Sequence, residues 1–173
     1  QNGYLPCSIL MDTPFVLDTG VSLWRPKNFS GRFQGPMTLR YALSRSVNTP
    51  TAKLYLDFGL QPVIDNVRRL GITADLPRVP ALFLGAGEVT LREVVGAYAT
   101  FANRGVHVEP HLVREVRDHR GDLMLQFKPE VQDAVRPEVA FLMNRSLEGV
   151  ITDGTGRAAA FIERPLAGKT GTT

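Results

Sequence analysis

The chain has 173 residues, of which 43% are hydrophobic and 21% charged, a balance that suits one domain with a buried core and excludes a disordered or low-complexity chain. Its 20 basic and 17 acidic residues leave a net charge of +3 without any block of like charge, so neither a nucleic-acid-binding stripe nor a polybasic membrane patch is indicated. The single cysteine, Cys7, cannot form an internal disulfide, and no apolar run approaches the roughly 18 residues that a membrane-spanning helix needs.

The first 35 residues mix prolines and glycines with isolated aromatic residues. This composition predicts a well-packed but irregular segment without long helices. A break at Gly35-Pro36 precedes Thr38, whose hydroxyl can cap a helix. The apolar spacing that follows predicts a helix over residues 39–45.

The next helix has a sharper start at Thr49-Pro50. The threonine is expected as the N-cap and the proline at the first helical position, where its missing N–H costs nothing. The apolar pattern then runs to Gly59, which is expected to end the helix. Residues 62–70 predict a third, short helix that Gly71 closes.

The clearest helix signal begins at Thr90, which forms a capping box with Glu93 because each side chain can reach the other's free backbone N–H. Gly105 is expected to follow the end of this helix. The residues expected to face the core are Leu91, Val94, Val95, Tyr98, Phe101 and Ala102. Apolar and β-branched residues over 108–116 and 123–127, on either side of a polar turn, predict a β-hairpin.

Pro137 is expected to open a last helix that ends at Gly149. The glycine-rich stretch over 153–157 lacks the spacing of a phosphate-binding loop, so it predicts a structural turn that borders a cleft. The segment at Lys169 predicts the beginning of a strand. These elements together indicate a mixed α+β fold.

The run Lys169-Thr170-Gly171-Thr172 places an ammonium, two hydroxyls and a glycine in consecutive positions. On a strand, the lysine and the glycine would face one side and the threonines the other. A cation with hydroxyls can bind a carboxylate through charge-assisted hydrogen bonds, and the glycine lets a ligand approach the backbone closely. A solvated lysine at a strand end is the simpler interpretation.

Ser46-Val47-Asn48 lies on the short link between two predicted helices. Ordinary helix-turn chemistry explains such a tripeptide. Its position, however, would hold both polar side chains at the edge of a cleft.

Taken in this order, the motifs resemble the active-site set of the penicillin-binding proteins. The similarity covers nearly the whole chain and is to the transpeptidase module of the class A, bifunctional members. The stretches that carry it are Arg25-Pro26-Lys27-Asn28-Phe29, Gly35-Pro36-Met37-Thr38-Leu39-Arg40, Ser46-Val47-Asn48-Thr49-Pro50, Leu84-Gly85-Ala86-Gly87-Glu88-Val89-Thr90, Ala97-Tyr98-Ala99-Thr100-Phe101-Ala102-Asn103, Asp153-Gly154-Thr155-Gly156-Arg157 and Lys169-Thr170-Gly171-Thr172-Thr173.

The resemblance implies the fold shared by penicillin-binding proteins and serine β-lactamases, here as a helical subdomain plus part of the central antiparallel sheet. It implies a serine acyl-transferase that acts on the D-Ala-D-Ala end of peptidoglycan stem peptides and is acylated by β-lactams, with no cofactor and no metal. The implied partners are those peptides, β-lactams and the remainder of the same transpeptidase domain. The implied location is the outer face of the bacterial cytoplasmic membrane, with the anchor outside this chain.

In this family the nucleophilic serine lies in a Ser-x-x-Lys motif. None of the six serines here is followed by a lysine three residues later. Neither end of the chain resembles a natural domain end. We therefore expect residues 1–173 to be part of one transpeptidase domain, beginning after the nucleophile motif and ending at the Lys-Thr-Gly strand, and we expect the chain alone to be inactive.

The resemblance implies that Ser46 relays a proton to the departing D-Ala nitrogen and that Asn48 holds the substrate amide carbonyl. Lys169 would keep the local field positive, and Thr170 would bond the terminal carboxylate. The backbone N–H of Thr172 would supply half of an oxyanion hole. Because one small substrate must touch these groups, Ser46 and Lys169 are expected to meet in space.

Two alternatives stay open at this point. A D,D-carboxypeptidase or serine β-lactamase relative would use the same motifs with water as the acceptor, although the class A stretches argue against it. A non-catalytic module that senses β-lactam or peptide would fit the missing nucleophile. A covalent penicillin label on an upstream serine would separate the enzymes from the sensor.

Overall fold

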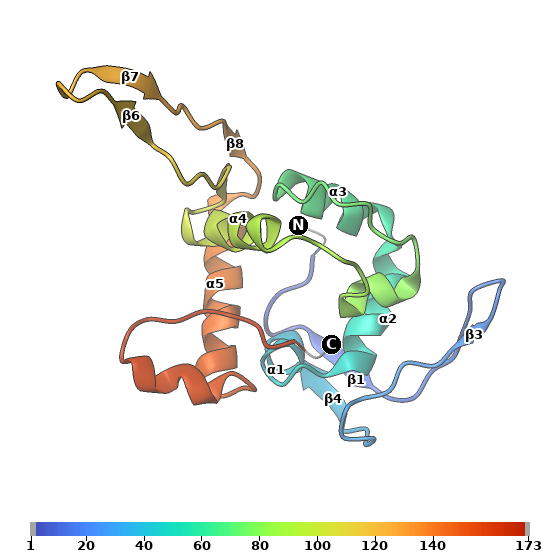
Figure 1. Cartoon of the computed structure of the whole chain (residues 1–173). Coiled ribbons are helices and arrows are strands. Elements are labelled where there is room, and N and C mark those ends of the chain that lie inside the picture. Colours follow the sequence, from blue (N-terminus) through green and yellow to red (C-terminus); the bar gives the residue numbers. More distant parts are fainter. Residues whose placement is uncertain (1–2, 172–173) are drawn as a thin grey trace.

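The computed structural model describes residues 3–171 and has the mixed α+β composition that the sequence predicts (Figure 1). Its helical segments are α1 (Leu39–Ser44), α2 (Asn48–Phe58), α3 (Gln61–Arg69), η1 (Pro80–Leu84), α4 (Leu91–Ala102), α5 (Pro137–Thr152) and η2 (Arg157–Ile162). Its strands form four antiparallel pairs, which are β1 (Ile9–Asp12) with β4 (Gly35–Thr38), β2 (Leu17–Asp18) with β3 (Leu23–Trp24), β5 (Val106–Val108) with β8 (Val131–Asp133), and β6 (Glu115–Arg117) with β7 (Leu123–Gln126). No helix within residues 3–171 is both long and apolar enough to cross a membrane.

A small apolar core joins the β1–β4 ladder to the first two helices. Leu10 lies opposite Met37 in the ladder, and both pack with Ala42 of α1 and Val47. The predicted irregular segment therefore contains short strands, whose pairing fixes where α1 begins. Thr38 caps α1 as predicted, because its hydroxyl accepts a hydrogen bond from the backbone N–H of Tyr41 at 3.2 Å.

The second helix begins earlier than the sequence predicts. Asn48 is its first residue, so Thr49 is not the N-cap and Pro50 occupies the third helical position. The reason is a distant cap, since the side-chain oxygen of Asn28 accepts the backbone N–H groups of Asn48 at 3.1 Å and Thr49 at 3.0 Å. Gly59 follows the helix with a φ of 65°, as expected for a helix stop.

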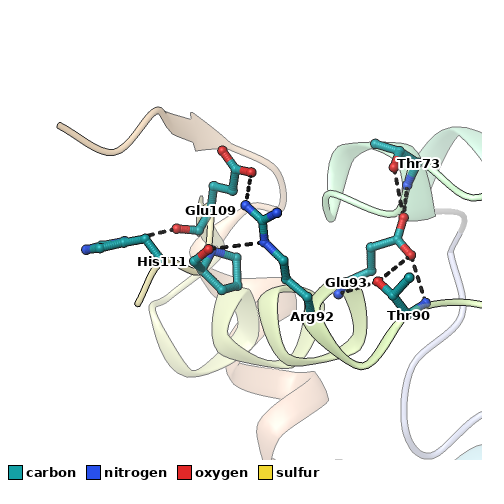
Figure 2. Close-up of polar contacts among 7 residues, drawn as sticks. Thr73, Thr90, Arg92, Glu93, Glu109 and His111 are labelled. Carbon is teal, nitrogen blue, oxygen red and sulfur yellow. Dashed lines mark hydrogen bonds and ion pairs between the residues drawn. The ribbon is translucent and has the colours of Figure 1, made fainter. Parts of the chain in front are cut away.

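The capping box of α4 is confirmed (Figure 2). The Thr90 hydroxyl accepts the backbone N–H of Glu93 at 3.3 Å, and the Glu93 carboxylate accepts the Thr90 N–H at 2.9 Å. The same carboxylate also accepts the backbone N–H groups of Thr73 at 2.7 Å and Ala74 at 2.9 Å. Glu93 therefore fastens the loop after α3 to the start of α4.

The predicted core face of α4 is wrong for four of its six residues, whereas Val94 and Phe101 are partly buried. Leu91, Val95 and Tyr98 are 79%, 50% and 40% exposed. The buried residues of this helix are the small ones, Gly96, Ala97 and Thr100. They lie where α4 approaches β5 and α5, and close approach between elements favours small residues over large ones.

Replacing Glu93 with glutamine, in a longer protein that carries this segment, should lower the unfolding temperature at neutral pH. Backbone hydrogen bonds from Thr90 and Thr73 lower the pKa of Glu93 to about 2. Because this folded-state pKa lies below that of an unfolded glutamate, the stabilisation is present above the unfolded pKa and is lost as the pH falls toward about 2. Thermal unfolding at neutral pH and near pH 2 should show a gap between the two proteins that closes in acid. Exposed Glu130→Gln is the control, and an equal gap at both pH values would contradict the assignment.

The predicted hairpin forms, but it is shorter than the sequence suggests. Strands β6 and β7 pair on either side of the predicted turn, where the Asp118 carboxylate accepts the backbone N–H groups of Arg120 and Asp122. Val108, by contrast, belongs to β5, which pairs with β8. Pro110 has no backbone N–H and interrupts the run between β5 and β6.

The last long helix passes through its predicted end. Gly149 lies within α5, which continues to Thr152. A Cβ atom at Gly149 would lie 3.4 Å from Nε of Arg40, so the missing side chain allows α1 and α5 to approach closely. A Cβ atom at Gly154 would lie 2.1 Å from the carbonyl oxygen of Ser44. The turn over 153–157 is thus packed against the end of α1.

Lys169 does not lie in a strand in the described part of the chain. The prediction that a strand begins at Lys169 is wrong for residues 3–171. A strand requires a hydrogen-bonded neighbour, and the backbone contact here is a long bond of 3.4 Å from the Gly168 N–H to the Leu147 carbonyl of α5.

Candidate functional site

The turn between α1 and α2 holds Ser46 in an unusual conformation. Its φ is 54°, in the left-handed region that non-glycine residues rarely adopt. Hydrogen bonds from the backbone N–H groups of Ser46 to Leu43 at 3.1 Å and of Val47 to Ala42 at 2.9 Å close the turn. Strain of this kind persists where the surrounding structure enforces it, and it is common at functional sites.

Lys169 meets Ser46 as predicted, although 123 residues separate them. The ammonium donates a hydrogen bond to the Ser46 hydroxyl at 2.7 Å and another to the Thr170 carbonyl at 2.8 Å. Partial burial lowers the pKa of Lys169 below the ordinary lysine value. None of the ion pairs within residues 3–171 involves Lys169, so its charge is available to an anionic ligand.

Asn48 stands in the first turn of α2, two residues after Ser46. Its side-chain amide donates a hydrogen bond to the Lys27 carbonyl at 2.9 Å. An amide nitrogen carries two N–H groups, so one donor remains for a further acceptor. No described hydrogen bond joins Asn48 to Lys169, and the link between them runs through the Ser46 turn.

The lysine segment is held against the glycine-rich turn. The Thr170 hydroxyl lies 2.5 Å from the Thr155 hydroxyl, and the Thr155 N–H donates to the Ser44 carbonyl at 3.0 Å. A Cβ atom at Gly171 would meet nothing within 4 Å, so the protein's own packing does not require glycine there. Thr172 lies outside the described residues.

Two residues of this arrangement were not predicted as site residues. Asn28 stands in one of the stretches that carry the family resemblance, and nothing in its local sequence signals a contact with residues 48 and 49. Thr155 was expected to be structural, although its hydroxyl contacts that of Thr170. Both contacts depend on tertiary packing, which local sequence patterns do not encode.

The resulting site combines a half-buried cation, a serine hydroxyl on that cation, two further hydroxyls and an amide. Such a set can bind a carboxylate and pass a proton between neighbouring polar atoms. No group of three or more His, Cys, Asp and Glu side chains in the described part of the chain could hold a metal ion.

Known proteins are similar to this chain in sequence and in fold. The sequence model of the penicillin-binding protein transpeptidase domain family matches residues 2–173. Penicillin-binding protein 1A of Neisseria meningitidis serogroup A is 35% identical over 183 residues, which cover all of this chain and 23% of that protein. Penicillin-binding protein 1A of Rickettsia typhi is 32% identical over 198 residues and is covered to 25% of its length. The crystal structure of penicillin-binding protein 1A from Haemophilus influenzae matches with a TM-score of 0.87 and 27% identity, over 99% of this chain and 32% of that one.

The chain belongs to the penicillin-binding protein transpeptidase domain family. Within it, the similarity is to the class A proteins of the 1A type, as the sequence motifs predict. The chain spans about a quarter of the length of these curated relatives.

Proposed function

We propose that the chain supplies the proton-relay and carboxylate-binding part of a peptidoglycan D-Ala-D-Ala transpeptidase site that β-lactams acylate. The observation that carries this proposal is the hydrogen bond of 2.7 Å from the Lys169 ammonium to the Ser46 hydroxyl. A serine held by a lysine can pass a proton to a leaving nitrogen, because the cation stabilises negative charge that develops on the hydroxyl oxygen.

The remaining roles follow from the same geometry. Asn48 offers its free amide N–H to the substrate carbonyl. Thr170, with Thr155 beside it, offers a hydroxyl to the terminal carboxylate, whose charge Lys169 balances. The open space beside Gly171 admits the substrate backbone. Thr172 is proposed for the oxyanion hole on family resemblance alone.

The nucleophilic serine is proposed to come from another segment of the same transpeptidase domain. Within residues 1–173 no serine has a lysine three residues later to take its proton. The same missing part of the domain is proposed to cover the exposed face of α4, where Leu91 and Val95 meet solvent. The segment is proposed to act at the outer face of the cytoplasmic membrane, as part of a longer anchored protein.

Mapping a labelled penicillin on the longer protein that carries this segment tests the proposal. The expected result is a stable covalent adduct on a serine in a Ser-x-x-Lys motif outside these 173 residues. Reversible binding without an adduct would instead support a sensor. An adduct on Ser46 would overturn the assignment of Ser46 as a relay.

The isolated chain should form no penicillin adduct and should unfold without a cooperative transition. The first expectation follows from the absence of an activated serine, and the second from the large apolar side chains that α4 exposes. Labelling and calorimetry should be carried out on the chain alone and again after the flanking segments are added. The addition should restore both the penicillin adduct and a cooperative unfolding transition. A lone chain that melts cooperatively and forms a stable adduct would contradict the proposal.

A further inference from the structure

We infer that Asn28, held by Asp12, is a positioning residue that sets the place of Ser46 and Asn48 in the site. This inference rests on the proposed function of that site. Neither residue touches Lys169 or Thr170 in the described hydrogen bonds, so the role of the pair is exerted through the turn before α2 and the first turn of α2.

The Asn28 side chain serves as the N-terminal cap of a helix that lies 20 residues further along the chain. Its single oxygen accepts hydrogen bonds from the Asn48 N–H at 3.1 Å, the Thr49 N–H at 3.0 Å and the Thr49 hydroxyl at 2.9 Å. These are the first two N–H groups of α2, and the third position is Pro50, which has none. Val47, the residue in the cap position, makes no side-chain cap bond.

Asp12 fixes the orientation of this amide. Asn28 donates one N–H to the Asp12 carboxylate at 2.8 Å and the other to the Arg32 carbonyl at 2.8 Å, so both donors face acceptors and the oxygen must face α2. The second carboxylate oxygen of Asp12 accepts the Gln34 N–H at 2.9 Å. Asp12 is fully buried and Asn28 is 7% exposed, so water cannot easily replace these bonds.

The same segment contacts Asn48 twice. Asn28 binds the backbone of Asn48, and the neighbouring carbonyl of Lys27 binds its side chain. Ser46 lies two residues before this fixed point, in its left-handed conformation. Loss of the Asn28 cap would free the start of α2, and the Ser46 hydroxyl and the Asn48 amide would shift together relative to Lys169.

Exchanging the charged and the neutral member of the pair provides a sharp test. In Asn28→Asp, a carboxylate replaces the amide that donates to Asp12, so two carboxylates face each other unless they share a proton. A charged group beside this strand is Lys53 of α2, whose ammonium donates to the Met11 carbonyl at 3.1 Å and to the Thr13 hydroxyl. In the reciprocal variant, Asp12→Asn with Asn28→Asp, the direct bond is rebuilt with donor and acceptor exchanged, while the Arg32 carbonyl still lacks the donor that Asn28 supplies.

The measurement is the second-order rate constant for penicillin acylation of the full-length protein. Asn28→Asp should lower it roughly 100-fold at neutral pH, the scale of a small misplacement of catalytic groups. The ratio of variant to wild-type rate should rise as the pH is lowered, because a shared proton removes the repulsion. The reciprocal variant should regain part of the lost rate at neutral pH, because the repulsion between carboxylates is removed but the bond to the Arg32 carbonyl is not restored.

Thr100→Val is the matched control for a general loss of stability. Thr100 is fully buried on α4, and its hydroxyl contacts the Gly96 carbonyl and His107, each at 2.9 Å. This variant should lower the unfolding temperature and leave the acylation rate at assay temperature unchanged. If Asn28→Asp loses no more rate than Thr100→Val, or if the reciprocal variant regains none, the positioning role is wrong. A normal rate in a Ser46→Gly variant would instead contradict the proposed function itself.

Discussion

Replacing Ser46 with glycine should lower the rate of penicillin acylation of the full-length protein by about 10²- to 10⁴-fold, the usual contribution of a positioned proton-transfer group. The hydroxyl that Lys169 binds at 2.7 Å is removed, and no other described residue donates to or accepts from that position. Glycine adopts a φ of 54° without strain, which stabilises the folded state by about 1 kcal/mol. Glycine also raises the conformational entropy of the unfolded chain, which offsets a similar amount.

The unfolding temperature of Ser46→Gly should therefore equal that of the wild-type protein. This separation of rate from stability distinguishes a functional hydroxyl from a structural one. Ser46→Ala should lose the same rate, and Ser30→Ala, at an exposed serine, serves as the control. A Ser46→Gly protein that acylates at the wild-type rate would remove this residue from the site.

Replacing Lys169 with methionine should lower the acylation rate by about 10²- to 10³-fold, comparable with the loss of one preorganised donor to developing charge. Methionine keeps the length of the side chain but cannot donate to Ser46 or to the Thr170 carbonyl. The unfolding temperature should barely change, because Lys169 is only half buried and forms no described ion pair within residues 3–171. Exposed Lys128→Met is the control.

The pH dependence of the wild-type acylation rate should report the titration of Lys169. Burial lowers the pKa of Lys169, so its charge, and with it the rate, should be lost as the pH rises through a value below the ordinary lysine range. Stability should move the other way, because between the folded and the unfolded pKa the unfolded chain binds more protons and rising pH favours the fold. In Lys169→Met the alkaline loss of rate should disappear, and its persistence there would assign it to another group.

The sequence predicts the local signals of this fold well. The capping box at Thr90 and Glu93 is self-contained, since both partners lie within one turn, and the structure contains it. The observed start of α2 differs from the predicted one because its cap comes from Asn28, which no pattern around Thr49 encodes. The strand at Lys169 could not be judged from its residues, because strand formation depends on a neighbour.

The contacts of the candidate site likewise fall into those that the sequence predicts and those that it does not. Motif resemblance, which summarises a shared tertiary structure, predicts that Ser46 and Lys169 meet, and the structure contains this contact. The contact of Thr155 with Thr170 and the buried link from Asp12 to Asn28 pair residues whose types are common in turns. Only their packing in three dimensions reveals that they meet.

A crystal structure of the full-length protein acylated by penicillin would test the shared site most directly. The adduct should lie between the Ser46 turn and the lysine segment, with its carboxylate bonded to the Thr170 hydroxyl and its side-chain amide carbonyl bonded to Asn48. The Ser46 hydroxyl, still held by Lys169, should face the β-lactam nitrogen. An adduct with no atom in hydrogen-bonding distance of Ser46, Asn48 or Thr170 would contradict the assignment of these residues to one transpeptidase site.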